Sequence, residues 1–273
     1  MIGRVVEPES VLAAFDPTKP NIARVYDYLL GGKDNFAADR ALGNQIIASL
    51  PTVQVGVRAQ REVLGRVVSY LVGEAVVGQL IDIGSGLPTA ESVHEVAQRI
   101  DPRTRVVYVD NDPVVLAHAR ALLADNPRTI VIEGDLRSPQ HIVNHPDARG
   151  HLDWDQPVGL LLCGIMHHIL DSERPHELMA LLRGALPAGS YVFIHHLVDS
   201  GDPAIADVQA ALRRGLGRGQ FRDWDQIRGL FDGFELVEPG LVLVPDWRPR
   251  GGTLRAEHHP VLRLACVGVA RKP

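Results

Sequence analysis

The stretch LIDIGSG, residues 80–86, combines a short apolar run, an acid and a Gly-x-Gly turn. A helical pattern, AESVHEVAQRI, follows and opens at Pro88 and Thr89. An apolar run that leads through a glycine turn into a helix is typical of a buried parallel strand. Glycines in such a turn let the backbone approach a nucleoside-bearing ligand closely. The stretch therefore predicts the first strand of a doubly wound sheet, with a ligand site at its end.

Two further apolar runs end in acids. RVVYVDNDP, residues 105–113, ends in Asp110, Asn111 and Asp112, and TIVIEGDLR, residues 129–137, reaches Asp135. A carboxylate at the end of the second strand can accept hydrogen bonds from both hydroxyls of a ribose. Dinucleotide enzymes and S-adenosylmethionine (SAM) enzymes share this feature, so the second acid alone does not separate them.

Two details favour SAM over a dinucleotide. The dinucleotide fingerprint Gly-x-Gly-x-x-Gly requires a third glycine, and Thr89 stands at that position. A third acid, Asp135, adds negative charge that does not help to bind a pyrophosphate. Any one acid is equally explained as a solvated strand end or a helix cap. Acids at three successive strand ends favour adenosine plus methionine.

Composition narrows the class of protein. The chain has 273 residues, 45% hydrophobic and 22% charged, which is ordinary for one large α/β domain. Its net charge of −5 argues against nucleic acid as a partner, because a nucleic-acid surface needs a basic excess. The longest apolar run, residues 158–166, is too short to cross a membrane, and residues 1–10 lack a secretory signal. We expect no membrane partner.

The two cysteines, Cys163 and Cys266, both stand in apolar runs. Two cysteines cannot form a disulfide framework, and we interpret them as small core residues. They are also too few to hold an iron–sulfur cluster by four thiolates, which excludes radical SAM chemistry. This cysteine usage predicts a reduced, cytoplasmic setting.

The first 75 residues are predicted to form an arm and a helical lid. Residues 1–20 are polar and contain three prolines, and Asn21 is positioned to cap the first helix. Residues 76–273 are expected to form the SAM-binding domain, in one globular unit with the lid. Helical patterns in the first part cover 22–30, 33–50 and 53–72.

Strands and helices alternate through the middle of the chain. This alternation predicts a parallel sheet with helices on both faces. Residues 139–156 are expected to form a loop, and 198–234 a long variable region. Strands are expected at 80–83, 105–110, 129–133, 158–164 and 190–197, and helices at 89–100, 113–125 and 173–185.

The end of the chain departs from this alternation. The runs 234–244 and 260–272 have no clear helix between them and predict an antiparallel pair at one edge. The expected fold is α/β: a doubly wound, Rossmann-like, mostly parallel sheet of seven strands with an antiparallel terminal strand pair and an N-terminal helical lid.

Several blocks of the chain resemble a bacterial family of SAM-dependent methyltransferases whose substrates are mostly unassigned. The resemblance runs from about residue 20 to the C-terminus and implies the class I methyltransferase fold, with SAM at the carboxyl ends of the central strands. The blocks are NIARVYDYLLGGKDNFAADR, LIDIGSGLPT, VHEVAQRIDPRTRVVYVDNDPVVLAHARALL, GDLRSP and GVARKP.

The resemblance implies roles at four strand ends. It places the ribose of SAM at Asp110 and Asn111 and the adenine at Asp135 and Leu136. The segment from Cys163 to His168 would face the transferred methyl group. The family pattern there has one histidine followed by an aromatic residue, whereas this chain has His167 and His168; the departure concerns the substrate pocket. The residues implied for the methionine end are Asp82, Gly84, Ser85 and Gly86.

Three aromatic residues stand close together in the predicted lid. Tyr26, Tyr28 and Phe36 fall within eleven residues of a chain that is 5% aromatic. Aromatic faces attract cations, and methyl transfer from a sulfonium needs water to be excluded. We therefore expect Tyr26 and Tyr28 to contact the cofactor. The alternative is that these rings only fix the helix to the core.

The twelve histidines include pairs at 167–168, 195–196 and 258–259. The first two pairs are expected after the fourth and fifth strands, near the ligand crevice. A histidine with a pKa near 7 can remove a proton from an attacking hydroxyl or amine. His168 and His167 are the first candidates for this base, followed by His196 and His195. The alternative is that they are ordinary hydrogen-bonded or surface histidines.

A metal site and a phosphate site are weaker interpretations of neighbouring residues. Histidines from two strands plus Asp199 would make a two-His, one-carboxylate set, but facing geometry is not visible in sequence, and we expect no metal. A basic run in the variable region suits an acidic substrate or, more simply, a solvated helix. The run consists of Arg213, Arg214, Arg218 and Arg222.

These patterns predict SAM-dependent methyl transfer to oxygen or nitrogen of a small molecule. No aspartate–proline–proline–aromatic motif of amino-methylating DNA enzymes follows the fourth strand. One alternative is a SAM sensor or partner-binding protein without turnover. Another is a nicotinamide oxidoreductase, which Thr89 and Asp135 disfavour. The edge hairpin and residues 198–234 are candidate surfaces for a homo-oligomer.

Overall fold

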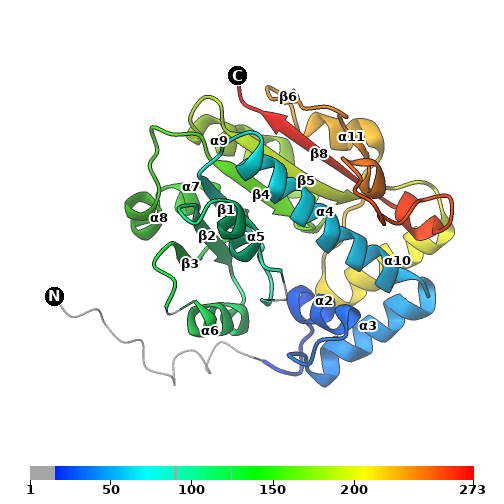
Figure 1. The fold of residues 1–273 in the computed structure, drawn as a ribbon. Coiled ribbons are helices and arrows are strands. Elements are labelled where there is room, and N and C mark those ends of the chain that lie inside the picture. Colours follow the sequence, from blue (N-terminus) through cyan, green and yellow to red (C-terminus); the bar gives the residue numbers. More distant parts are fainter. Residues whose placement is uncertain (1–15, 89–90, 124) are drawn as a thin grey trace.

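The sheet of the computed structural model has the strand order β3-β2-β1-β4-β5-β8-β6, and β7 also pairs with β8 (Figure 1). The structure describes residues 16–88, 91–123 and 125–273. Strands β1 to β5 pair in parallel, and β8 pairs antiparallel with β5, β6 and β7. The predicted doubly wound, mostly parallel sheet with an antiparallel edge is confirmed. The strands are β1 Gln79–Ile83, β2 Arg105–Asp110, β3 Thr129–Glu133, β4 Gly159–Cys163, β5 Tyr191–Leu197, β6 Glu235–Leu236, β7 Val242–Leu243 and β8 Ala265–Arg271.

The antiparallel edge differs in detail from the prediction. The run 234–244 is divided into β6 and β7 by Pro239 and Gly240, and each piece contributes two residues to the sheet. In the run 260–272, Pro260–Arg263 forms a 3-10 helix, η4, before β8 begins. Proline has no N–H to donate to a ladder, which explains both interruptions.

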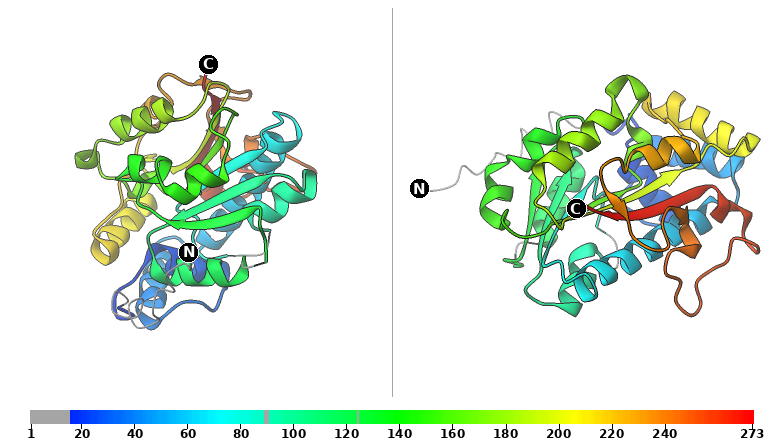
Figure 2. Two further views of the ribbon diagram at one scale, coloured as in Figure 1. Left: turned by 90° about the vertical axis from the view of Figure 1, so that its left-hand side faces the viewer. Right: turned by 90° about the horizontal axis from the view of Figure 1, so that it is seen from above.

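Helices cover both faces of the sheet (Figure 2). Side chains alternate along a strand, so Leu80 of β1 joins the core on one face while Ile81 and Ile83 join the core on the other. Asp82 therefore points to the same face as Leu80. Among the residues described, every helix is too short or too polar to span a bilayer. The first face packs against α4 Val53–Gly73, α5 Val93–Ile100 and α6 Pro113–Leu122, and the second against α7 Pro139–Val143, α8 Pro146–His151, α9 Pro175–Ala185 and α11 Trp224–Gly229.

The predicted start of one helix and the predicted loop at 139–156 are wrong. The helix expected from residue 89 begins at Val93, where Ser92 and Glu95 form a reciprocal capping box; residues 89–90 lie outside the described residues. The expected loop 139–156 contains α7 and α8. Each of these helices has proline at its first position, where the missing N–H costs no hydrogen bond.

Three helices gather beside the carboxyl ends of the parallel strands (Figure 1). They are α2 (Ile22–Leu30), α3 (Ala37–Ser49) and α10 (Pro203–Leu216). The predicted cap is confirmed, because the Asn21 side chain accepts a hydrogen bond of 2.7 Å from the Ala23 N–H. The expected N-terminal arm lies mostly outside the described residues.

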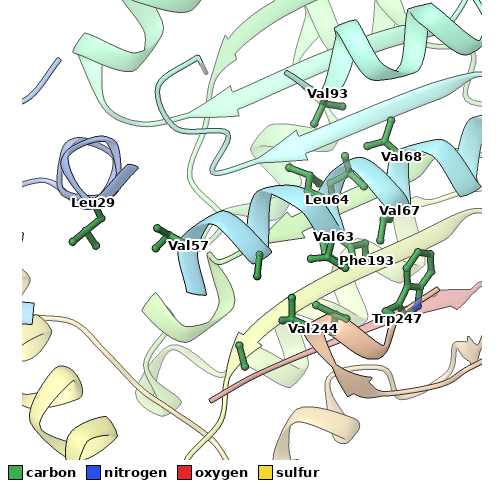
Figure 3. Packing of buried hydrophobic residues seen from close by; sticks show 14 of the residues in the cluster. Leu29, Val57, Val63, Leu64, Val67, Val68, Val93, Phe193, Val244 and Trp247 are labelled. Atoms are coloured by element: carbon green, nitrogen blue, oxygen red, sulfur yellow. The ribbon is translucent and has the colours of Figure 1, made fainter. Parts of the chain in front are cut away.

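Helix α4 joins these three helices to the sheet. Its residues Val63, Leu64 and Val67 are buried and pack near Phe193 of β5 and Trp247 (Figure 3). Each such side chain contributes roughly 1.5–3 kcal/mol by burial. The same helix begins beside α2 and runs along the sheet, so its first turns are fixed next to the strand ends.

A buried arginine ties α2 to the second strand. Arg24 Nε donates to Asp39 at 2.9 Å, and Arg24 Nη1 donates to Asp112 at 2.9 Å. Asp112 also caps α6 by accepting from the Val114 N–H at 2.8 Å. A single guanidinium therefore connects α2, α3 and the turn after β2, which is the turn that carries Asp110.

Replacing Arg24 by alanine is expected to lower the free energy of unfolding by about 3–5 kcal/mol, because Asp39 and Asp112 would stay buried without their cation. Urea denaturation measures this. Arg40→Ala is the matched control: Arg40 is exposed on α3 and donates to the Asn35 carbonyl at 2.9 Å, and its loss should cost less than about 1 kcal/mol. Equal losses for the two variants would contradict the anchoring role of Arg24.

Candidate functional site

A cavity of about 330 Å3, which we call the strand-end cavity, lies at the carboxyl ends of β1 to β4, beside α2 and α4. Pockets of roughly 300–1,000 Å3 are the usual size for cofactors and small ligands. The structure brings almost all of the sequence-predicted cofactor residues to this one cavity. They are Asp82, Gly84, Ser85, Gly86, Asp110, Asn111, Asp135, Leu136, Cys163 and Tyr26.

Tyr28 lies away from this lining. Its hydroxyl donates to Asn44 Oδ1 at 2.7 Å, and its ring lies where a side chain at Gly43 would stand. Tyr28 therefore joins α2 to α3, as the alternative interpretation of the aromatic residues expects. Tyr26 instead lines the cavity, and its hydroxyl donates to the Val57 carbonyl at 3.1 Å.

The glycine turn after β1 depends on left-handed backbone at Gly84 (φ 74°) and Gly86 (φ 67°). Side chains disfavour this conformation. At Gly84 a β-carbon would also stand 2.7 Å from Ile165 Cδ1. The Gly84 N–H donates to the Val109 carbonyl at 2.8 Å, and the Gly86 N–H donates to the Asp110 carboxylate at 2.9 Å. The turn is thus held against the end of β2.

Asp110 organises the backbone around itself. Its carboxylate accepts from three amides: Gly86 at 2.9 Å, Asn111 at 2.8 Å and Asp112 at 3.0 Å. A carboxylate has about four acceptor positions, so one is left for a ligand hydroxyl. Burial raises the pKa of Asp110, and the three amides oppose that rise.

The carboxylate of Asp135 is fully hydrogen-bonded by its neighbours. Arg137 donates to it from its backbone at 2.9 Å, from Nε at 2.8 Å and also from Nη2, and Asn111 Nδ2 donates at 3.0 Å. These bonds, chiefly those of the Arg137 side chain, lower the pKa of Asp135 to about 2. All four acceptor positions are filled. A ligand amino group must therefore displace one of these donors to reach Asp135.

Asp82 is the most perturbed carboxyl group of the cavity. It is 4% exposed. Burial raises its pKa to about 7, with Asp110 adding to the rise and Arg61 opposing it. A cation brought beside Asp82 would favour its ionised form and offset the cost of burying the charge.

Two polar residues of α4 also line the cavity and were not singled out as site residues from the sequence. Gln60 and Arg61 line it, and Gln60 Nε2 lies 3.6 Å from Cys163 Sγ. Burial raises the pKa of the Cys163 thiol to about 12, so this sulfur is neutral. A polar pair on a helix that otherwise buries an apolar stripe was the available sequence signal.

A second cavity of about 320 Å3 lies on the other side of the glycine turn. It shares Arg61, Asp82, Ser85 and Gly86 with the strand-end cavity, and its walls include Tyr108 of β2 and Val93 of α5. Asp82 and the glycine turn thus stand between two hollows, and only the strand-end cavity includes Asp110, Asn111 and Asp135.

The four candidate histidines are all buried. His167 and His168 form the 3-10 helix η1 (Met166–His168) after β4, whereas His195 and His196 lie inside β5 rather than after it. Burial lowers the pKa of His168 and of His195 to about 4, that of His196 to about 3, and that of His167 well below its usual value. The expectation of a histidine titrating near pH 7 is therefore wrong at these four positions.

Neighbouring side chains of β5 point to opposite faces, and of its two histidines His195 lines a third, smaller cavity, whereas His196 does not. His168 lines the strand-end cavity. His196 is absent from the described linings of the cavities and packs against Arg222, with 3.2 Å between Nε2 and Arg222 Nη1. This contact supports a structural role for His196.

The four arginines of the basic run also differ in their surroundings. Arg213 and Arg214 are exposed, as a solvated helix predicts. Arg222 is buried, against that prediction, and Nη2 donates to the Ile169 carbonyl at 2.9 Å and to Asp171 at 2.7 Å. Arg218 lines the strand-end cavity and donates to Glu173 at 2.9 Å. These contacts hold the segment that carries His167 and His168.

The alternative metal site is not formed by the described residues. Asp199 is exposed, whereas His195 and His196 are buried. Across residues 16–88, 91–123 and 125–273, no three His, Cys, Asp or Glu side chains are placed to hold a metal ion.

Comparison with known proteins identifies the family. The family model described as S-adenosyl methyltransferase matches residues 8–273. The chain belongs to this S-adenosyl methyltransferase family. A search of curated proteins found no significant match. The protein is a SAM-dependent methyltransferase, and the predicted enzyme class and cofactor are confirmed.

Solved structures agree with this family. A Thermobifida fusca protein provisionally assigned as a methyltransferase is 43% identical, with 98% of this chain and 99% of that one covered and a TM-score of 0.91. A DUF574 family protein from Streptomyces avermitilis is 37% identical, with 94% and 99% covered and a TM-score of 0.89. An O-methyltransferase family 2 protein from Planctomyces limnophilus, solved with apigenin, is 17% identical, with 91% and 65% covered and a TM-score of 0.50, and it shares the fold.

The strand-end cavity suits the chemistry of SAM. SAM carries an adenosine, a sulfonium and an amino acid, and the cavity offers an acceptor position at Asp110, apolar surface at Leu136 and a buried carboxyl group at Asp82. When bound, the cofactor supplies an electrophilic methyl group. The residues of the chain then have to orient an acceptor in line and exclude water.

Proposed function

We propose that this methyltransferase binds SAM in the strand-end cavity and methylates oxygen or nitrogen of a small-molecule acceptor. The observation that carries the proposal is the convergence of Gly86, Asp110 and Asn111 with Asp135 and Leu136 around one hollow. These residues come from three neighbouring strand ends, where doubly wound proteins bind their ligands.

Each part of the cavity takes one part of the cofactor. Asp110 and Asn111 would bind the ribose. Leu136 would pack on the adenine ring, and Asp135 would accept from its amino group once Arg137 moves aside. The methionine end would lie against Asp82, Gly84, Ser85 and Gly86. Cys163, Tyr26 and His168 line the part of the cavity proposed for the transferred methyl group.

The N-terminal helices act in this proposal as a cover for the methyl donor. Residues 1–75 would form the arm and lid, and residues 76–273 the catalytic domain, in one globular unit. Tyr26 of α2 lines the cavity, and Arg24 fixes α2 to Asp112, two residues after Asp110. The cover is therefore connected directly to the proposed ribose site.

The same proposal includes a small-molecule partner in a reduced, cytoplasmic setting. Cys163 and Cys266 are free thiols. The net charge of −5 disfavours nucleic acid as the acceptor. The Planctomyces limnophilus protein with the same fold holds apigenin, a small molecule. A homo-oligomer remains a prediction of the sequence.

Titration calorimetry with SAM, followed by incubation with deuterated-methyl SAM and a small-molecule extract, tests the proposal. We expect saturable SAM binding at one site per chain and a product that gains one labelled methyl group. The acceptor atom follows from fragmentation of that product. SAM binding without transfer across a broad acceptor panel would instead favour the sensor alternative.

A further inference from the structure

A third, smaller cavity of about 100 Å3 adjoins the strand-end cavity. We call it the histidine chamber because His167, His168 and His195 line it. Ile22, Tyr26, Gln60 and His168 line both the chamber and the strand-end cavity. The chamber therefore adjoins the part of the strand-end cavity that we propose for the methyl group.

The walls of the histidine chamber are mostly aliphatic. Val57 of α4 and Ile205, Val208 and Leu212 of α10 contribute side chains, as do residues of η4 and β8. No Asp, Glu, Lys or Arg occurs among its described lining residues. A charged ligand would lose its hydration there without gaining a counter-charge, which is strongly unfavourable.

The histidines that line this chamber carry hydrogen-bonding atoms that no described residue uses. His167, His168 and His195 are 6%, 6% and 2% exposed. The Nδ1 atom of each is buried and has no hydrogen-bond partner among the described residues. Leaving a buried polar atom unpaired costs about 1–3 kcal/mol, so such atoms usually have a functional or solvent partner. Three imidazoles that each carry an unpaired nitrogen line one cavity, which favours a ligand with a polar atom.

Size limits that ligand further. An apolar cavity of roughly 150 Å3 accommodates benzene. The histidine chamber is smaller, at about 100 Å3, but it adjoins the strand-end cavity. It can take no more than one ring, with the reactive edge of the ring at the boundary that Gln60 and His168 share.

We propose that the histidine chamber is the methyl-acceptor site and that its ligand is a small, neutral, single-ring molecule with an aromatic hydroxyl. This inference rests on the proposed function, because it needs SAM in the adjoining cavity. It adds the acceptor class, the choice of oxygen, and His195 and α10 as parts of the site.

The reaction balances with these groups. The acceptor oxygen forms a bond to the methyl carbon while the sulfur–carbon bond breaks and its electron pair stays on sulfur. The acceptor proton passes to the neutral imidazole of His168 and then to solvent. The positive charge moves from sulfur to imidazole, so no extra charge is created inside the protein. Burial holds the pKa of His168 near 4, and such a weak base favours an acidic, phenolic hydroxyl over an aliphatic one.

Phenol is the probe, with benzoate and benzylammonium as charged rings of similar size. In the SAM-loaded protein we expect phenol to bind and to gain a deuterated methyl group from labelled SAM, detected by mass spectrometry. Benzoate and benzylammonium should bind at least tenfold more weakly. Equal binding of the three rings would overturn the neutral-acceptor assignment.

Two variants locate the phenol site. Val208→Trp fills the chamber, and His195→Phe removes one of the unpaired nitrogens without touching the strand-end cavity. Each should weaken phenol binding at least tenfold while the dissociation constant of SAM changes less than twofold, which also shows that the variant is folded. Ala206→Trp is the matched control, because Ala206 is exposed on the same helix.

The outcomes separate this inference from the proposed function. Normal SAM binding with no phenol binding, or with phenol binding that neither variant weakens, overturns the chamber assignment and leaves the proposed function standing. Failure of the wild-type protein to bind SAM overturns the proposed function, and the chamber assignment with it.

Discussion

Replacing Asp110 by alanine is expected to weaken SAM binding at least 100-fold. The change removes the proposed ribose acceptor and leaves the amides of Gly86, Asn111 and Asp112 without their shared partner. A hydrogen bond to a charged group contributes about 1.5–3 kcal/mol, so the lost ribose contact together with a loosened glycine turn reaches this magnitude.

Titration calorimetry with SAM measures the effect of Asp110→Ala. Asp101→Ala is a matched control, because Asp101 ends α5 on the surface and accepts from the Arg103 backbone at 2.9 Å. Circular dichroism shows whether each variant is folded. An unchanged SAM dissociation constant in folded Asp110→Ala would show that the ribose does not lie at this strand end.

Replacing Asp82 by asparagine is expected to make the ligand-free protein more stable at pH 8 by an amount on the order of 3 kcal/mol. The pKa of Asp82 is about 7 in the folded protein and near its ordinary value of 3.8 when exposed. Between these values the unfolded chain is ionised at Asp82 while the folded chain keeps the proton. The contribution of Asp82 to the free energy of unfolding should therefore fall as the pH rises from about 4 to 7. Asparagine does not ionise, so the variant should not show this loss.

Urea denaturation at pH 5 and pH 8 checks the sign. At pH 5 the asparagine variant should already be more stable by roughly 1.5 kcal/mol, because the loss in the wild type begins near pH 4, and at pH 8 the difference should be at least twice as large. The affinity for SAM should change with pH in the opposite direction. In the wild type it should rise as the pH increases from 5.5 to 7.5, because the cationic methionine end favours ionised Asp82. The variant should bind SAM weakly, with an affinity that does not change over this pH range. A variant less stable than wild type at pH 8 would contradict the assigned pKa.

The fold was largely predictable because its signals are local. Each apolar run of β1 to β5 is short, and each is followed by residues that start a turn or helix, so strand identity follows from the chain itself. The strand ends could also be predicted as a site, because carboxyl ends of parallel strands meet at one edge. Asp82, Asp110 and Asp135 meet there without any long-range information being needed.

What the sequence did not predict depends on contacts between distant residues. Arg24 pairs with Asp112, which is 88 positions away, and Arg222 binds the carbonyl of Ile169, 53 positions away. The spacing of apolar residues along the chain does not predict such pairs. The same holds for the pKa of His168, which is lowered by burial and by the charge of Arg218, 50 positions away.

Short-range patterns misled in two places. Proline and histidine in residues 139–156 suggested a loop, although proline is well tolerated at the first position of a helix. Arg137 donates hydrogen bonds to Asp135, only two positions away. An acid and an arginine at this spacing are common on protein surfaces, so the sequence did not predict that Asp135 would be fully hydrogen-bonded.

The most direct test is a crystal structure of the protein with S-adenosylhomocysteine bound. We predict a ribose hydroxyl within hydrogen-bonding distance of Asp110, the adenine ring against Leu136, and the sulfur facing Cys163 and His168. Product density in the cavity beside Tyr108, on the far side of the glycine turn, or a ribose that makes no contact with Asp110, would contradict this prediction.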